Sequence, residues 1–268
     1  HAIFAGVAGW NITNGGTPDA PITYQAYPGE VPVIDPTVLS QPLVWEQQPE
    51  GWWVATIPTG SAVLNYTNIT VQIKEGWTAT QVAPVPDQPH TMPANFITPP
   101  AAYKINGKLG YDLVWFDSTT NQIYFRSNEI EPVMSPNDQC TLSSSGTQFH
   151  INGASNLIFD GITVENACSW HINTADSITI RNCTVEHTAA GMWLYATNVL
   201  VEHNYIDFTA GTMNSAGTGR WNQNHCVYFN GSGIIRNNFV GRSWSGGGMG
   251  ASRNSYDYVF ANNVCFGA

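Results

Sequence analysis

Residues 177–186 read SITIRNCTVE, and residues 198–207 read NVLVEHNYID, which is nearly the same pattern again. The apolar positions of the two segments coincide: Ile178 with Val199, Ile180 with Val201, and Val185 with Ile206. Apolar and polar residues alternate along both segments, and a period of two predicts β-strands with one buried face. The match therefore indicates a repeating strand unit, and a unit of about 20 residues is typical of a solenoid.

The same unit continues on both sides of this pair. Its second apolar position holds Phe159, Ile180, Val201, Ile235 and Phe260, so the steps are regular except for a long one between Val201 and Ile235. A second short strand precedes four of the units, with the sequences FHIN (149–152), WHIN (170–173), MWLY (192–195) and CVYF (226–229). We expect each unit to form one coil of strands, stacked about 4.8 Å from the next.

A bend is predicted after the second apolar position of each unit. The residue pairs at this point are Gly161-Ile162, Asn182-Cys183, His203-Asn204, Asn237-Asn238 and Asn262-Asn263. Gly and Asn tolerate the left-handed backbone conformation that a sharp bend requires. Stacked Asn side chains can also hydrogen-bond from one coil to the next, so we expect an asparagine ladder here.

This pattern resembles the right-handed parallel β-helix of the pectate-lyase-like superfamily over residues 148–268. The segments FHINGASNLIFDGITVENA (149–167) and NHCVYFNGSGIIRNNFV (224–240) are similar to coils of secreted bacterial β-helix proteins. PITYQAYPGEVPVID (21–35) is similar to their early coils, and residues 111–126 resemble a hairpin that often follows those coils. The superfamily includes glycoside hydrolases, polysaccharide lyases, epimerases and fibre proteins, so the resemblance implies an all-β solenoid without selecting one activity.

Departures from the period divide the chain into three parts. We expect early coils over residues 1–36, a β-hairpin-rich insertion over 37–136, and the main coils over 137–268. The long step between Val201 and Ile235 predicts a protruding loop at 208–224. Because an uncovered coil is a sheet edge and no capping helix is visible, either a longer chain or another copy is expected to cover the ends. Copies stacked end to end would form a filament.

Composition limits the partners of the chain. Of its 268 residues, 43% are hydrophobic and 10% are charged, with a net charge of −10. This balance argues against nucleic acid, and against polyanionic ligands unless a cation bridges them. No run of about 18 apolar residues predicts a membrane span. A signal peptide is not visible ahead of His1, but Asn-X-Ser/Thr sequons suit a secreted glycoprotein, at Asn11, Asn65, Asn68, Asn182 and Asn230.

Three acidic residues fall into one column of the repeat. Glu165, Glu186 and Asp207 occupy the same position of successive units, which predicts about 5 Å between neighbours and about 9–10 Å from end to end. Such proximity raises a carboxyl pKa or recruits a cation, so Ca²⁺ is the cofactor this column suggests, with the identity of any metal left open. These separations span the geometries of both retaining and inverting glycosidases. The alternative is three solvated acids at strand ends.

Other candidate residues surround this column. His187 follows Glu186, and Arg220 and Trp221 in the long loop are placed to cover a site there. His225 opens the next coil and is a second catalytic candidate, with Arg253 expected nearby. Three tryptophans in or beside loops have flat faces that could stack on sugar rings, namely Trp193, Trp221 and Trp244.

Two further columns have a structural interpretation. Asp160, Arg181, Glu202 and Arg236 alternate in sign, which predicts an exposed salt-bridge ladder. His150 and His171 should stack as part of a polar outer ladder, with Met192 taking the same position in the next coil.

These features support three hypotheses for function. The favoured one is a secreted protein that hydrolyses or binds a largely neutral polysaccharide, with hydrolysis favoured over lyase chemistry because few arginines are available to neutralise a uronate. The alternative is a non-catalytic extracellular fibre, sheath or adhesin, which the low charge and the uncapped coils favour. A carbohydrate-binding protein without catalysis lies between them.

Overall fold

A computed structural model of the chain describes residues 10–34, 43–58, 69–73, 77–82, 92–99, 101, 104–109, 112–117, 119–127, 129, 140–144, 149–165, 170–188, 191–209, 212–213, 220–221, 226–241 and 248–266. The described part of the protein is all-β, apart from the short helix α1 (Ala94–Ile97). No helix among these residues has the length and apolarity needed to cross a membrane.

Two parallel sheets are built mainly from the repeat region. Sheet 1 consists of β1 (Trp10–Ile12), β2 (Ile22–Gln25), β13 (Phe149–Asn152), β14 (Ser155–Asp160), β16 (Trp170–Arg181), β18 (Met192–Glu202), β22 (Val227–Arg236), β24 (Met249–Ala251) and β25 (Tyr258–Ala261). Sheet 2 consists of β3 (Val33–Ile34), β15 (Thr163–Glu165), β17 (Thr184–Thr188), β19 (Tyr205–Thr209), β23 (Phe239–Val240) and β26 (Val264–Cys265). The chain passes from one sheet to the other in each repeat.

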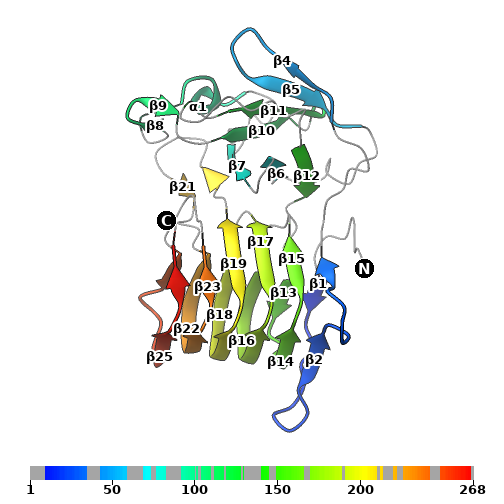
Figure 1. Cartoon of the computed structure of the whole chain (residues 1–268), viewed down its shortest axis with the longest axis vertical. Coiled ribbons are helices and arrows are strands. Elements are labelled where there is room, and N and C mark those ends of the chain that lie inside the picture. The colour runs from blue at the N-terminus through cyan, green and yellow to red at the C-terminus, as the bar shows by residue number, and fades with distance from the viewer. Residues whose placement is uncertain are drawn as a thin grey trace.

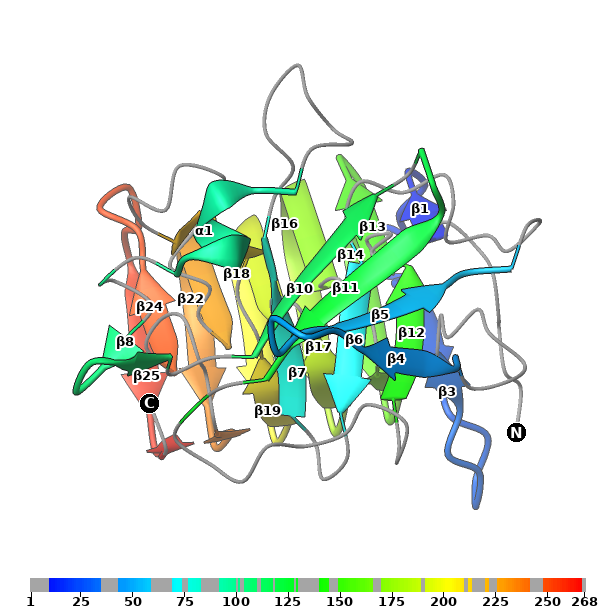
Figure 2. The same ribbon diagram turned by 90° about the horizontal axis from the view of Figure 1, so that it is seen from above.

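A third sheet lies across one end of these strands. Sheet 3 is mixed and contains β4 (Trp45–Gln47), β5 (Trp53–Thr56), β6 (Ile69–Ile73), β7 (Trp77–Val82), β10 (Leu113–Asp117), β11 (Gln122–Arg126), β12 (Cys140–Ser144), β20 (Thr212–Met213) and β21 (Arg220–Trp221). A separate hairpin consists of β8 (Lys104–Ile105) and β9 (Lys108–Leu109). Figure 1 shows sheet 3 above the arrowheads of β15, β17 and β19, and Figure 2 shows β10 and β11 running across the parallel strands. Strand β7 contacts both β17 and β19.

The structure differs in two places from the three-part division predicted from the sequence. Strand β12 lies inside the segment 137–268 assigned to the main coils, but it pairs with β6 of sheet 3. Strands β20 and β21 lie inside the predicted loop 208–224 and also extend sheet 3, through β7. Within residues 111–126, β10 and β11 pair antiparallel.

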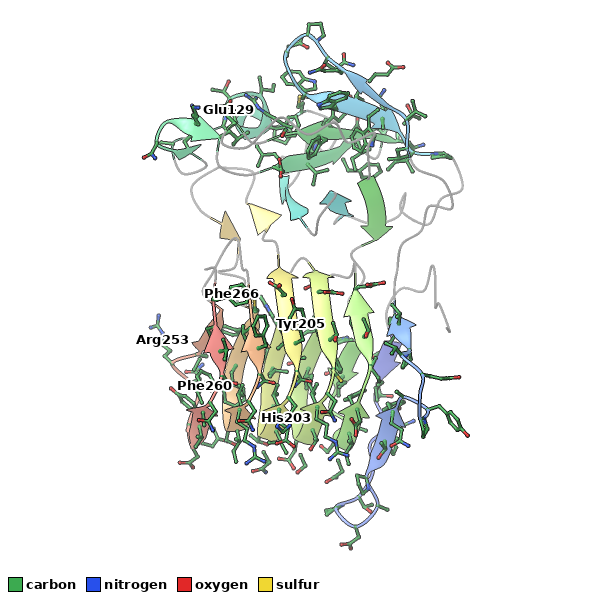
Figure 3. The ribbon with its side chains drawn as sticks, viewed as in Figure 1. Glu129, His203, Tyr205, Arg253, Phe260 and Phe266 are labelled. Atoms are coloured by element: carbon green, nitrogen blue, oxygen red, sulfur yellow. The ribbon has the colours of Figure 1, made fainter. Side chains whose placement is uncertain are left out.

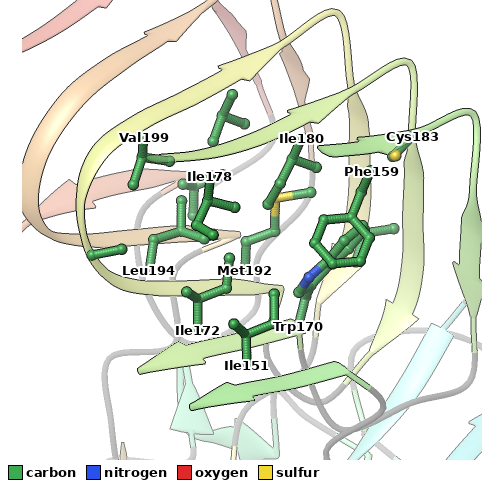
Figure 4. Close-up of a cluster of buried hydrophobic side chains, with 14 of the residues drawn as sticks. Ile151, Phe159, Trp170, Ile172, Ile178, Ile180, Cys183, Met192, Leu194 and Val199 are labelled. Carbon is green, nitrogen blue, oxygen red and sulfur yellow. The ribbon is translucent and has the colours of Figure 1, made fainter. Parts of the chain in front are cut away.

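The repeat sets the register of the parallel strands. The predicted apolar column is present, because neighbouring strands pair Phe159 with Ile180, Ile180 with Val201, Val201 with Ile235, and Ile235 with Phe260. The first four of these side chains are fully buried. They belong to one core between sheets 1 and 2, part of which is shown in Figure 4. Burying each such side chain stabilises the fold by about 1.5–3 kcal/mol.

The predicted bends and the asparagine ladder are also present. Asn182, His203, Asn237 and Asn262 have φ values of 54°, 56°, 54° and 52°, which lie in the left-handed region. Asn204, Asn238 and Asn263 hydrogen-bond in series, since the backbone N–H and Nδ2 of Asn204 and of Asn238 donate to Oδ1 of the next member. Because Asn204 and Asn238 are both 2% exposed, these bonds satisfy buried polar groups.

The charged column forms two of its predicted ion pairs. Arg181 Nε lies 2.8 Å from Asp160 Oδ2, and Arg236 Nη2 lies 2.8 Å from Glu202 Oε2. Both arginine side chains are largely exposed, so each pair stabilises the fold by less than about 1 kcal/mol. Cys183, Cys226 and Cys265 are not in disulfide bonds among the described side chains, and burial raises the pKa of the Cys183 thiol to about 11.

Candidate functional site

Aromatic and polar side chains cover the outer side of sheet 1. Along β16, Trp170 and Ile172 are fully buried, whereas the intervening His171 is half-buried. Along β18, Met192 and Leu194 are fully buried in the same way, and Trp193 between them is half-buried. Because successive side chains of a strand point to opposite faces, the half-buried residues lie on the outer side.

The strand register places these outer residues in two columns. One column contains His150, His171, Trp193 and Tyr228, on β13, β16, β18 and β22. The other, displaced by two positions along each strand, contains Asn152, Asn173, Tyr195 and Asn230. We call the five ring-bearing members the aromatic face: His150, His171, Trp193, Tyr195 and Tyr228.

The rings of the aromatic face contact one another continuously. His150 and His171 are stacked, with ring centroids 5.3 Å apart and planes 24° apart. His171 meets Trp193 and Tyr195 edge to face, both at 5.9 Å. Tyr228 lies 5.7 Å from Trp193 and 5.9 Å from Tyr195. The result is an unbroken array of rings across four neighbouring strands.

The sequence prediction was wrong about which residue follows His171 in this column. Repeating the step from His150 to His171 selects Met192, but the structure pairs His171 with Trp193, and Met192 is in the core. The register shifts between Asn173 and Ala175, because β16 contains Thr174 as an extra residue. Thr174 has a φ of 54° and is exposed, which is typical of a bulged position.

Two rings at the centre of the aromatic face, those of His171 and Tyr195, are uncharged near neutral pH. Partial burial and the neighbouring His150 lower the pKa of His171 below its usual value, so its imidazole is neutral at about pH 7. Burial and the neighbouring Tyr228 raise the pKa of Tyr195, so its phenol also stays protonated. Trp193 Nε1 is buried and has no hydrogen-bond partner among the described residues. An array of rings with a neutral centre, bordered by amides, suits an uncharged ligand that has both apolar faces and hydroxyl groups.

The predicted acidic column is present on sheet 2. Glu165 pairs in register with Glu186, and Glu186 with Asp207, on β15, β17 and β19. Glu165 and Glu186 are half-buried, whereas Asp207 is 0% exposed. Strand β17 ends at Thr188 and β18 begins at Met192, so little chain separates the two. Glu186 on sheet 2 and Trp193 on sheet 1 are therefore at adjoining ends of their strands.

Asp207 is held inside the protein by its neighbours. Tyr205 Oη donates a hydrogen bond of 2.8 Å to Asp207 Oδ2, and the Tyr205 ring stacks on Phe239 at 5.0 Å. A Cβ atom at Gly241 would lie 2.2 Å from Asp207 Oδ1, so the carboxylate packs directly against the backbone of that residue. Figure 3 shows Tyr205 on the strands that approach sheet 3.

The acidic column does not by itself form a metal site. Within the described part of the chain, no group of three His, Cys, Asp or Glu side chains is arranged to hold a metal ion. The packing of the Asp207 carboxylate against Tyr205 and Gly241 is a physical reason for this, because it leaves the half-buried Glu165 and Glu186 without a third accessible carboxylate.

The other predicted site residues are only partly described. The backbones of His187, Arg220 and Trp221 lie in β17 and β21, but their side chains are outside the described residues, as are His225 and Trp244 entirely. Arg253 is exposed and points away from the protein beside the last strands (Figure 3), so it joins neither the aromatic face nor the acidic column.

Sequence reasoning missed two members of the aromatic face, Tyr195 and Tyr228. Their signal was present in MWLY (192–195) and CVYF (226–229), where rings occupy the outward positions of strands already identified. It also missed Tyr205, which precedes Asp207 by two positions on the same side of β19.

A groove lies elsewhere on the protein, away from the aromatic face. This groove has a volume of about 780 Å³, and its lining includes Asn198, Ile234, Arg236, Tyr256 and Asp257. It lies near the bends of β18 and β22 and contains the single aromatic ring of Tyr256 in place of a continuous array.

Comparison of the chain with models of protein families, with curated proteins and with solved structures finds no match.

Proposed function

We propose that the chain is an extracellular, glycan-binding protein with a right-handed parallel β-helix fold, and that a largely neutral polysaccharide binds across the aromatic face. The observation that carries this proposal is the continuous contact of five half-buried rings on the outer side of sheet 1. The outer surface of these half-buried rings remains in contact with water, so a ligand can reach it.

The β-helix part of the proposal is supported by the register. Strands of both parallel sheets pair with the strand one repeat away, and the chain alternates between the sheets. Connections between parallel strands of one sheet are right-handed in nearly all proteins, which supports the stated handedness. Resemblance of the repeat to the pectate-lyase-like superfamily points to the same fold and to an extracellular setting.

Neutral glycan is the ligand class that suits the chemistry of the face. The axial C–H groups of a sugar form an apolar surface that stacks on aromatic rings, while its hydroxyl groups need hydrogen-bond partners. Asn152, Asn173 and Asn230 border the rings and can both donate and accept. The net charge of −10 disfavours an acidic glycan near neutral pH.

Binding is tested with a panel of short neutral oligosaccharides, including gluco-, xylo-, manno- and galacto-configured chains. We expect at least one to bind the full chain in isothermal titration calorimetry and to quench tryptophan fluorescence. If every neutral member fails while acidic oligosaccharides bind, the proposed ligand class is wrong; if none of either kind binds, glycan binding itself is rejected.

Hydrolysis of the bound glycan is the activity that the in-register carboxylates of the acidic column favour. Neighbouring strands place Glu165 and Glu186 about 4.8 Å apart at their backbones, which is compatible with the separation of about 5–5.5 Å between carboxyl groups of retaining enzymes. Asp207 is buried, so we assign it the role of positioning this column while Glu186 contacts the glycan.

We predict that the double variant Glu186→Gln/Asp207→Asn loses glycan turnover by at least about 100-fold, because a general acid or base contributes that much to the rate. Turnover is measured as reducing ends released from a panel member that binds. Glu46→Gln, an exposed glutamate on β4, is the matched control and should keep full turnover. Unchanged turnover in the double variant would remove the acidic column from the mechanism and leave the binding proposal intact.

Self-association is the second candidate function, and one observation favours it. Tyr258, Phe260 and Phe266, on or next to the outermost strands β25 and β26, are 41%, 38% and 43% exposed. Figure 3 shows Phe260 and Phe266 at this edge. Electron microscopy and light scattering of the purified protein test this candidate, and isolated monomers at high concentration would count against it.

A further inference from the structure

Two histidines form one end of the aromatic face. His150 and His171 are stacked at 5.3 Å, so their rings share one side of the surface on which a glycan would lie. His171 also meets Trp193 and Tyr195 edge to face, so it joins the histidine pair to the rest of the face. A change in the charge of this pair therefore changes the surface on which the ligand would bind.

The carboxylates of Glu165 and Glu186 lie on the adjoining sheet 2, but the pKa of His171 is lowered by burial and by His150, so these acids do not offset a charge on that ring. On the outer side, His150 is flanked by Asn11 of β1, and the next strands contribute Trp193, Tyr195 and Tyr228. None of these side chains is a carboxylate that could pair with a protonated imidazole.

The charged residues of β16 make hydrogen bonds or ion pairs with residues other than the histidine pair. Asp176 and Arg181 lie beyond the bulge at Thr174, away from the histidine pair. Asp176 accepts hydrogen bonds from Ser177, Thr197 and Asn198, and Arg181 pairs with Asp160. A proton on the histidine pair would therefore add a charge without a described counter-charge.

We propose that His150 and His171 together make glycan binding sensitive to pH: the aromatic face holds the neutral glycan while both imidazoles are uncharged and releases it when the pair takes up a proton. This inference rests on the proposed glycan binding and adds its regulation.

The reason is the cost of covering a charged ring. A protonated imidazole is strongly hydrated, and an apolar sugar face laid over it removes that water. The positive charge also withdraws electron density from the ring, which weakens its attraction for C–H groups. Stacking at 5.3 Å couples the two sites, so the pair titrates with apparent pKa values that belong to the pair. Burial and the neighbouring His150 lower the pKa of His171, which keeps the glycan-binding form populated at neutral pH.

The sign of the effect follows from linkage. Because binding requires the unprotonated pair, affinity is constant at high pH and falls by up to about tenfold for each pH unit below the first apparent pKa. We expect this decline to begin at or below about pH 6.5, the usual pKa of histidine. The dissociation constant should therefore rise by more than about twofold as the pH is lowered from about 8 to 5.

The test is calorimetric titration of the full chain with the neutral oligosaccharide that binds most tightly in the panel above, from about pH 8 to pH 5. The double variant His150→Asn/His171→Asn should bind more weakly at high pH but with an affinity that changes less than about twofold over this range. His203→Asn is the matched control: His203 is exposed at a bend where Asn is equally suited, and its removal should leave the pH dependence intact. If the double variant does not fold, His150→Asn alone should make the decline shallower.

A second measurement uses the unmodified protein. Nuclear magnetic resonance titration of its histidines should show that the bound oligosaccharide lowers the apparent pKa values of the pair and leaves that of His203 unchanged. Binding that does not vary with pH, or pKa values that the ligand does not move, would overturn the pH inference while leaving glycan binding in place. Absence of binding at every pH would reject the proposed function and this inference together.

Discussion

Replacing Trp193 by alanine is expected to weaken binding of the neutral glycan by about 30- to 100-fold. Trp193 is the central ring of the aromatic face, with His171, Tyr195 and Tyr228 all within 6.3 Å between centroids. Tryptophan at the partly desolvated centre of a binding surface is a typical hot-spot residue, and truncating such a residue to alanine costs about 2 kcal/mol or more. Calorimetry with the panel oligosaccharide at mildly alkaline pH measures the loss directly.

Two variants make this result specific. Trp193→Phe retains a ring and should lose less than half of the binding free energy that Trp193→Ala loses. Tyr256→Ala removes the aromatic ring of the groove and should leave affinity within about twofold of the parent, since that groove is not the proposed site. If Tyr256→Ala loses binding and Trp193→Ala does not, the glycan binds in the groove and the aromatic face has no part in it. Thermal unfolding of each variant separates lost binding from lost folding.

The register of the parallel strands was predictable from the sequence because each inward position is filled by an apolar residue, with a step of 21 residues from Phe159 to Ile180 and from Ile180 to Val201. A slip by a single position would move the whole column of Phe159, Ile180, Val201 and Ile235 out of the core. The same constraint fixed the register of the outward-facing residues that follow on sheet 2. The pairing of Glu165 with Glu186 and of Glu186 with Asp207 was therefore predictable from the spacing.

Extrapolating the 21-residue step gave the wrong pairing where β16 contains an extra residue. Thr174 bulges out of β16, and this displaces the upstream half of the strand relative to β18. A polar residue in a bend is compatible with either register, so the sequence offered no signal against Met192. Only the structure places Trp193 in the column of His150 and His171. With Trp193 in this position, the column predicted to be a polar ladder is an aromatic array.

Burial of an acid is harder to predict than its position. Spacing placed Asp207 beside Glu186, but its full burial depends on Tyr205 and on the absence of a side chain at Gly241, which comes only after β23. Sheet 3 is likewise built from pairings without a period, such as β12 with β6 and β20 with β7. Such contacts leave no repeating pattern to extrapolate.

Asn238→Ala is expected to lower the free energy of unfolding by about 3 kcal/mol or more, a large effect for a polar residue. The Asn238 side chain is 2% exposed and uses both of its polar atoms. Nδ2 donates to the Val201 carbonyl and to Asn263 Oδ1, and Oδ1 accepts from the backbone N–H and Nδ2 of Asn204. Alanine would leave several buried groups unpaired, each at a cost of about 1–3 kcal/mol. Urea unfolding measures the change.

Asn254→Ala is the matched control for this variant, because Asn254 is exposed and its side chain has no comparable place in the ladder. It should change the free energy of unfolding by less than about 0.5 kcal/mol. An equally small change for Asn238→Ala would mean that the ladder is not what holds the bends in register. Asn238 lies at the bend after β22, away from the ring of Tyr228 on the same strand. The folded fraction of Asn238→Ala should therefore bind glycan with the affinity of the parent, because the ladder acts on the stability of the register and the rings act on the ligand.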